Sequence, residues 1–165
     1  MVTRSYIDGF EPSLEDLKRH LRITSDDLDG TLKMYLLAAI ESAEHHIGCI
    51  IARSEFVYDG WFLRSFDMKG PGCELKSVEI DGESLDEADY KVSRNTLLIS
   101  QDVTMCEKMT VTYEAGITQV PFDIKAAVLL IAAKLFNNPV DSVETLPSVA
   151  KNLLRPYRSW GRHGE

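Results

Sequence analysis

The spacing of the apolar residues changes twice along the chain, and this change constrains the fold more than any other feature of the sequence. Over residues 28–47, apolar side chains recur every three or four positions, which is the period of an amphipathic helix. Over residues 54–116 they alternate with polar side chains in three runs, which is the period of a half-buried strand. From residue 122 the helical pattern returns. The sequence therefore predicts an antiparallel β segment between helices.

After a short polar lead, two helices are expected ahead of the β segment. The first should span residues 13–22, because Ser13 can cap it and Asp16, three positions later, can bond back to the Ser13 amide. Residues 26 and 27 are both aspartate, and their carboxylates suit the positive end of a second, longer helix. Gly48 is expected to end that helix in a left-handed conformation.

Three alternating runs make up the predicted β segment, at residues 55–58, 74–80 and 108–113. The pair Asp81-Gly82 follows one of these runs and is typical of a tight hairpin turn, and Arg94-Asn95 is a second, weaker signal of the same kind. We therefore expect a small antiparallel meander that is inserted between helices.

Two further helices are expected after the β segment. Pro121 is tolerated at the start of the first of them. Residues 124–136 are apolar nearly all round, as expected of a central buried helix, and the Asn-Asn-Pro sequence at 137–139 should end it. A last short helix can begin at residue 147 or 148 and run to residue 155, where Pro156 stops it.

The predicted fold class is therefore mainly α, a small bundle of about four helices with an inserted antiparallel β meander. The chain has 165 residues, the length of one domain. We expect that single domain over residues 1–165, with a helical core at 13–50 and 120–158 and a β insertion at 54–116. A chain of this length buries enough surface to fold without a metal or a disulfide.

The formal net charge of the chain is −8. This balance argues against a protein that coats nucleic acid, because non-specific affinity for nucleic acid comes from neutralising phosphates with cations. The charge is also unevenly distributed. Residues 55–116 contain 6 basic and 13 acidic groups, whereas residues 117–165 contain 6 basic and 4 acidic groups. We therefore expect an acidic meander and a basic tail.

Three widely spaced cysteines, Cys49, Cys73 and Cys106, argue for reduced thiols in a cytosolic context and against a disulfide framework or a structural zinc site. The N-terminal residues lack the apolar stretch of a signal peptide. The longest purely apolar run, residues 126–133, is far too short to cross a bilayer. We therefore expect a protein that is made and kept inside a cell, without a membrane partner.

Motifs that would indicate an enzyme are missing or incomplete. The sequence contains no nucleophile elbow, P-loop or dinucleotide fingerprint. Residues 25–30 superficially resemble a calcium loop, but Leu36 stands where a bidentate glutamate is required. Glu41, His45 and His46 cluster late in the second helix without the His-Glu-x-x-His arrangement of a catalytic zinc site. A solvated helix face explains this cluster better, so no catalytic, cofactor or metal site is predicted.

The C-terminal segment at residues 146–160 is more informative. Its mixture of apolar, aromatic and cationic side chains is enriched in protein interfaces. The alternative is a terminal helix that docks on its own core. Because the tail is basic and the meander acidic, contact between the tail of one subunit and a neighbour is electrostatically reasonable. The residues that carry this pattern are Leu153, Leu154, Tyr157 and Trp160, together with Lys151, Arg155 and Arg158.

Three stretches of the sequence, taken in order, resemble the head-tail connector family of tailed phages, the adaptor that docks beneath the portal. The first is residues 13–23 with Asp26-Asp27 and a long helix, the second is residues 121–127 running into an apolar helix, and the third is Leu146-Pro147 with residues 153–158. This similarity covers nearly the whole chain, and the β insertion is of the kind that many family members carry.

The resemblance implies a non-enzymatic structural virion protein of a phage or prophage, which has no cofactor and forms a ring of about a dozen copies beneath the portal. Such a ring extends the DNA channel, lets DNA pass without specific binding, and docks the tail or a stopper protein. Its location would be the virion neck, and the bacterial cytoplasm during assembly. The interface with other subunits or the portal would comprise Leu146, Pro147, Lys151, Leu153, Leu154, Arg155, Pro156, Tyr157 and Arg158.

Two alternatives from other classes remain open at this point. One is a small metal-dependent hydrolase that uses Glu41, His45 and His46. The other is a monomeric host binding module whose tail packs on its own core.

Overall fold

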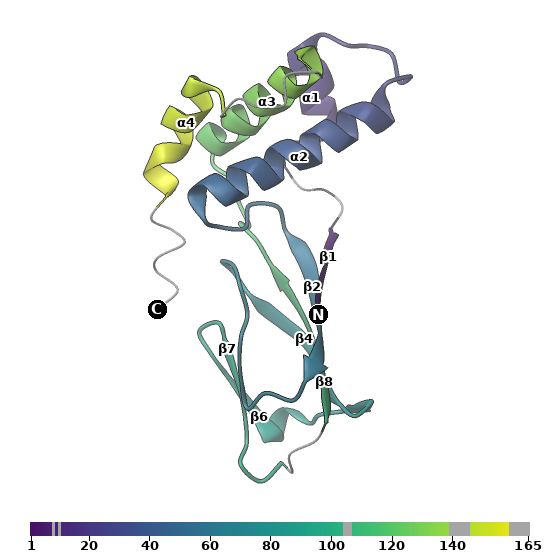
Figure 1. Ribbon diagram of the computed structural model, residues 1–165, viewed down its shortest axis with the longest axis vertical. Coiled ribbons are helices and arrows are strands. Elements are labelled where there is room, and N and C mark those ends of the chain that lie inside the picture. Colours follow the sequence, from purple (N-terminus) through teal and green to yellow (C-terminus); the bar gives the residue numbers. More distant parts are fainter. Residues whose placement is uncertain (8, 10, 104–106, 139–145, 159–165) are drawn as a thin grey trace. The chain divides into compact units, whose positions relative to one another are not determined.

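The computed structural model describes residues 1–7, 9, 11–103, 107–138 and 146–158. The chain divides into two compact units. The first unit, Met1–Asp8 with Ala52–Thr118, contains the strands, and we call it the β unit (Figure 1). The second unit, Gly9–Ile51 with Gln119–Glu165, contains the α-helices, and we call it the helical unit.

Five strands form the larger sheet of the β unit, in the order β1-β2-β8-β4-β5, and all of its neighbours are antiparallel. The sequence predicts only a short polar lead before the first helix, but these residues form strand β1. Thr3 of β1 pairs with Val57 of β2, so the N-terminus is part of the sheet. Most side chains of this short strand are exposed, so its sequence carries no clear alternation. The five strands are β1 (Val2–Tyr6), β2 (Ser54–Trp61), β4 (Glu74–Ile80), β5 (Glu83–Ser84) and β8 (Lys108–Ala115).

Three more strands form a second antiparallel sheet in the order β3-β7-β6, namely β3 (Ser65–Asp67), β6 (Tyr90–Ser93) and β7 (Thr96–Ile99). The prediction of a mainly α fold with an inserted meander is therefore wrong. Strands make up 28% of the described residues and form two sheets. A meander pairs consecutive strands, whereas β2 pairs with β1 and with β8 from the far end of the segment. The spacing of the hydrophobic residues shows which face of a strand is buried, but it does not show which strand lies beside it.

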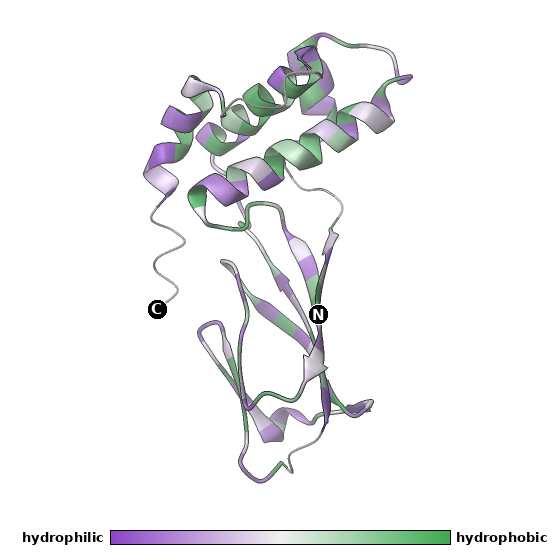
Figure 2. Ribbon diagram, in the orientation of Figure 1, coloured by the Kyte–Doolittle hydropathy of each residue, from purple (hydrophilic) through white to green (hydrophobic). Residues whose placement is uncertain are grey.

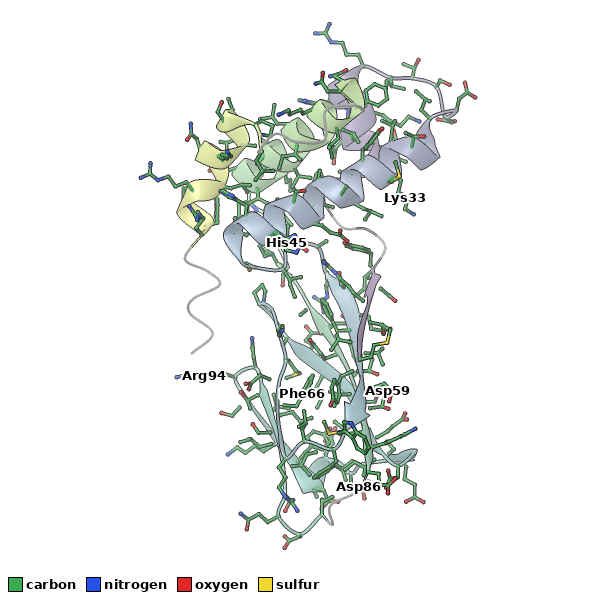
Figure 3. All side chains as sticks on the ribbon, viewed as in Figure 1. Lys33, His45, Asp59, Phe66, Asp86 and Arg94 are labelled. Carbon is green, nitrogen blue, oxygen red and sulfur yellow. The ribbon has the colours of Figure 1, made fainter. Side chains whose placement is uncertain are left out.

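Aromatic side chains fill the interior of the β unit. Phe56 and Tyr113 are paired across β2 and β8, and their rings stack with centroids 5.3 Å apart. Phe66, from the smaller sheet, meets Tyr113 edge-on at 6.0 Å. Figure 3 shows Phe66 pointing into the unit, whereas Asp59 lies at its surface. The buried face of each sheet thus follows the period-two pattern of its strands.

The turns of the β unit depend on residues that tolerate a left-handed backbone. The predicted hairpin turn between β4 and β5 is confirmed, because Asp81 and Gly82 have φ values of 51° and 87°, as a type I′ turn requires. Arg94, with φ of 54°, joins β6 to β7 as expected. Gly116 follows β8 with φ of 143°, and a Cβ atom there would lie 2.5 Å from the Arg53 Cα. This position therefore requires glycine.

The first two helices of the helical unit are α1 (Leu14–Leu21) and α2 (Asp29–Ile47). The predicted cap of α1 is confirmed. The Ser13 Oγ accepts a hydrogen bond from the Asp16 amide at 3.2 Å, and the Asp16 carboxylate accepts one from the Ser13 amide at 3.0 Å. The expected end of α2 is also confirmed, because Gly48 has φ of 73° and its amide bonds to the last turn.

The third helix, α3 (Phe122–Asn137), packs against α1, α2 and α4, so its predicted central position is confirmed. It is not buried all round, because Phe122 is 85% exposed and Ala126 is also exposed. α4 (Ser148–Leu154) continues into the 3-10 turn η2 (Arg155–Tyr157). Within the described residues, no helix is both long and apolar enough to span a membrane. The buried stripe of α3 has helical spacing and comprises Ile124, Ala127, Val128, Ile131 and Ala132.

Candidate interface surfaces

The last helical segment, α4 with η2, carries most of the residues expected at an interface. Pro147 immediately precedes α4, and Pro156 lies in η2, where its ring prevents the α-helix from continuing. Ala150 and Leu154 are four positions apart and fully buried, and α4 packs on α3. Leu154 therefore belongs to the core of the helical unit. Figure 2 shows hydrophobic colours along α3 and hydrophilic colours over much of α4.

The other residues expected at the interface lie at or near the surface. Arg155, Pro156 and Arg158 are exposed. Trp160 lies outside the described residues. The tail interface, without Leu154, therefore stays a prediction that the arrangement of its side chains permits. The half-buried members are Leu146, Pro147, Lys151, Leu153 and Tyr157.

Three cations lie on one side of this segment, and we call Lys151, Arg155 and Arg158 the basic surface. Their spacings of four and three residues place them on the same side of a helix. Burial lowers the pKa of His46, on α2, and the charges of Arg158 and Lys151 lower it further. The described part of the chain provides no carboxylate within ion-pair distance of any member of the basic surface.

Six carboxylates lie within residues 79–89, a stretch without lysine or arginine, and we call them the acidic segment. The β4–β5 hairpin and the 3-10 turn η1 (Glu87–Asp89) hold them, and Figure 3 shows Asp86 at the surface of the β unit. Asp81 accepts a hydrogen bond from the Lys108 amide at 2.9 Å, but among the described residues no member has an ion-pair partner. All members but Asp89 are exposed. They are Glu79, Asp81, Glu83, Asp86, Glu87 and Asp89.

Other acidic groups of the β unit are neutralised within the chain. Arg53 Nη2 lies 2.7 Å from a Glu74 oxygen and 2.9 Å from a Glu114 oxygen, and Lys76 Nζ lies 3.1 Å from Glu114. Hydrogen bonds from Lys76 and Arg53 lower the pKa of Glu114. The two cations and two carboxylates of this cluster therefore neutralise one another, in contrast to the acidic segment.

The calcium-like stretch at residues 25–30 is also neutralised within the chain. Lys18, whose side chain is only 6% exposed, lies 2.9 Å from an Asp29 oxygen and also forms an ion pair with Asp26. The hydrogen bond from Lys18 lowers the pKa of Asp26. The ammonium group thus contacts the carboxylates that a metal ion would require.

The cluster late in α2, which consists of Glu41, His45 and His46, does not form a metal-binding site among the described residues. Glu41 and His45 are exposed, whereas His46 is half-buried beside the cations of the basic surface, which disfavour another positive charge. The described residues contain no group of three or more His, Cys, Asp or Glu side chains that could hold a metal ion.

The sequence-based prediction did not identify two exposed aromatic residues as candidates for an interface. Trp61, at the end of β2, is 77% exposed, and Phe122, at the start of α3, is 85% exposed. The alternation of β2 could have revealed Trp61, because it shares the outward face with Asp59 while Phe56 points inward. Exposed aromatic side chains are enriched in protein interfaces, so both are further candidates for contact with a partner.

A comparison with known protein families finds that residues 11–68 match the family described as phage gp6-like head-tail connector protein. This range contains α1, α2 and the first strands that follow them. It includes the first of the three stretches on which the sequence resemblance was based, whereas the other two stretches lie beyond it. No curated protein matches the sequence.

Solved structures with a similar fold come from particles of a gene transfer agent (GTA). A chain in the neck of the empty GTA particle, computed with C6 symmetry, is 15% identical, with a TM-score of 0.68 over 94% of this chain and 95% of that chain. A chain in the neck of the native particle, computed with C12 symmetry, is 15% identical, with a TM-score of 0.67 over 94% of both chains. A chain in the virion of the native particle is 14% identical, with a TM-score of 0.65 over 94% of this chain and 95% of that chain.

The sequence resemblance, the family match and the fold agree with one another. The fold is shared over nearly the full length of this chain with proteins of a particle neck. The match of residues 11–68 to the connector family model is a similarity found independently of the fold. The expected resemblance is thus confirmed: residues 11–68 match the phage gp6-like head-tail connector family, and the fold of the chain is similar to that of proteins in a particle neck.

Proposed function

We propose that this protein is a structural subunit of a ring in the neck of a phage or phage-like particle, where it connects the head to the tail. The observation that carries the proposal is the fold, which matches neck proteins over 94% of the chain. The two neck structures were computed with C6 and C12 symmetry, and cyclic symmetry relates identical copies by rotation. Its role is mechanical rather than catalytic, and both units of the chain act together as one connector domain.

In detail, the ring contains about twelve copies, binds the portal on one side and binds a tail or stopper protein on the other. DNA passes through the channel without specific contacts. The net charge of −8 favours this arrangement, since a surface that attracts few phosphates lets DNA slide.

The tail segment is the part of the chain proposed to contact another subunit or the portal. Arg155, Pro156 and Arg158 are exposed, and Lys151, Leu153 and Tyr157 present part of their side chains. Leu154 supports this segment from beneath, because it is buried against the helical unit. The segment is thus a docked helix with one polar, cationic side that faces outward.

The test is the state of assembly of the full chain, measured by light scattering coupled to gel filtration over a wide concentration range. Particles from any large fraction are imaged by negative-stain electron microscopy. The proposal predicts closed rings of about a dozen subunits, either from the protein alone or after addition of the portal protein encoded in the same genome.

Two outcomes contradict the proposed function. One is a protein that remains monomeric at every concentration and does not co-elute with the portal ring. The other is an open filament, because a head-to-tail contact whose rotation does not close gives a fibre and not a connector.

A further inference from the structure

Several charged clusters among the described residues are neutralised within the chain. Lys18 pairs with Asp26 and Asp29, Arg53 and Lys76 pair with Glu74 and Glu114, and Lys125 pairs with Glu11. Against this background, the basic surface and the acidic segment stand out among the described residues. They have opposite signs, and neither has ion-pair partners there.

The exposure and composition of the basic surface favour contact with a partner. Ala150 and Leu154 are buried on one side of α4, whereas Arg155 is exposed and Lys151 is half-buried. The side chain of Val149 is 56% exposed and adds apolar area beside the cations. A surface that combines arginine with apolar area is typical of an interface.

The acidic segment has a fixed backbone, although its side chains are exposed. Glu79 pairs with Ser84 in the β4–β5 hairpin, and the Leu85 amide donates a hydrogen bond to the Val78 carbonyl at 2.8 Å. The Asp89 amide donates a hydrogen bond to the Asp86 carbonyl at 2.9 Å. These bonds hold the backbone that carries the carboxylates, and a cationic partner would meet several negative charges along one short segment.

A closed ring places a requirement on the surfaces of its subunit. Each copy must present two different surfaces that fit one another, because a rotation brings one surface of a copy against the other surface of the next copy. Electrostatic complementarity between such surfaces speeds encounter and excludes wrong registers.

We propose that the basic surface of one copy binds the acidic segment of the adjacent copy in the ring, an inference that rests on the proposed function. The contact joins the helical unit of one subunit to the β unit of the next. Arg155 and Arg158 pair with carboxylates such as Glu83 and Glu87, while Lys151 lies at the edge of the contact.

A second copy of this chain fits the basic surface better than DNA does. Three cations neutralise few phosphates, and the remainder of a chain with a net charge of −8 repels them. The acidic segment provides six carboxylates on a surface that every copy carries.

The test uses two full-length charge-reversal variants. The tail-reversed variant carries Arg155→Glu and Arg158→Glu, and the segment-reversed variant carries Glu83→Lys and Glu87→Lys. All four side chains are exposed, so both variants should fold, which circular dichroism checks. The matched control, Lys33→Glu with Lys69→Glu, reverses two exposed cations outside both surfaces and changes the net charge as the tail reversal does.

The assay is sedimentation equilibrium, alone and in mixtures, in about 50 and about 500 mM NaCl. Each reversed variant alone should associate at least about tenfold more weakly than the wild type, since like charges then face one another. An equimolar mixture should recover association to within about threefold and form rings in which the variants alternate. The control should associate like the wild type, and high salt should weaken wild-type association.

Three results would overturn the inference. Wild-type association of both reversed variants refutes the charge pairing while leaving the ring itself intact. A wild-type chain that does not self-associate at any salt or concentration also refutes it, whereas the proposed function is judged separately by co-elution with the portal. Finally, a tail reversal that leaves self-association unchanged but abolishes binding to a labelled DNA duplex assigns the basic surface to DNA instead.

Discussion

Replacing Leu154 with alanine should destabilise the helical unit without any partner present. The side chain is fully buried on α4 beside Ala150, and α4 packs on α3. The substitution removes three carbon atoms, whose transfer from water contributes about 0.8 kcal/mol each, or about 2.4 kcal/mol in total. The cavity left behind adds to this cost, so the free energy of unfolding should fall by about 3 kcal/mol, within the usual range for buried leucine.

The assay for this variant is urea unfolding followed by circular dichroism at 222 nm, which reports mainly on the helices. With an m value of about 2 kcal/mol per molar urea, the midpoint should fall by roughly 1.5 M. The matched control is Val149→Ala on the same helix, whose side chain is 56% exposed, and its midpoint should correspond to a change of no more than about 0.5 kcal/mol.

A small effect would refute this reasoning. If Leu154→Ala and Val149→Ala both cost less than about 1 kcal/mol, then α4 is not docked on α3 in solution and Leu154 is available to a partner. A large effect means that an aspartate at this position would unfold the helical unit. Reversal of Arg155 and Arg158 is then the cleaner test of the interface, because both side chains are exposed.

Two further predictions concern local hydrogen bonds and ion pairs. Ser13→Ala should reduce the free energy of unfolding by about 1 kcal/mol, because the Asp16 amide loses its capping oxygen, and Ser13→Thr should retain most of it in the same urea assay. Stability should also fall in acid. The backbone hydrogen bond from Ser13 holds the pKa of Asp16 below its ordinary value of 3.8, Lys18 does the same for Asp26, and Lys76 holds Glu114 below 4.5. A carboxyl whose folded pKa is depressed contributes stability above its unfolded pKa and loses it as pH falls through the folded value. The urea midpoint should therefore decline below about pH 4, and an unchanged midpoint at pH 3 would contradict the role given to these contacts. His46, whose folded pKa lies below its ordinary value of 6.5, adds a separate loss of stability as the pH falls below that value.

Short-range features of this fold were readable from the sequence. The cap at Ser13, the left-handed stop at Gly48 and the turn at Asp81-Gly82 each depend on residues within four positions of one another. Such contacts form whatever the rest of the chain does, so residue type and spacing suffice to predict them. The order of the three stretches that resemble the connector family is likewise a property of sequence alone.

The pairing of the strands into sheets could not be predicted from the sequence in this way. β1 pairs with β2 across about fifty residues, and β2 pairs with β8 rather than with its neighbour in sequence. The strand period shows that one face is buried but leaves the partner strand open, since any strand with a matching face satisfies it. Pairing between distant strands depends on the packing of the whole unit, and this is why a meander in a mainly α fold was predicted and two sheets are found.

The same division applies to the candidate interface. The sequence by itself determined that the tail is basic, the β segment acidic and both ends of the tail segment apolar or aromatic. Only the tertiary structure decided that Leu154 faces the core while Leu153 remains half-buried, and that Arg53 and Lys76 neutralise some carboxylates but not those of residues 79–89. Composition counts charges and apolar groups, whereas burial and neutralisation depend on which side chains the fold brings within a few ångströms.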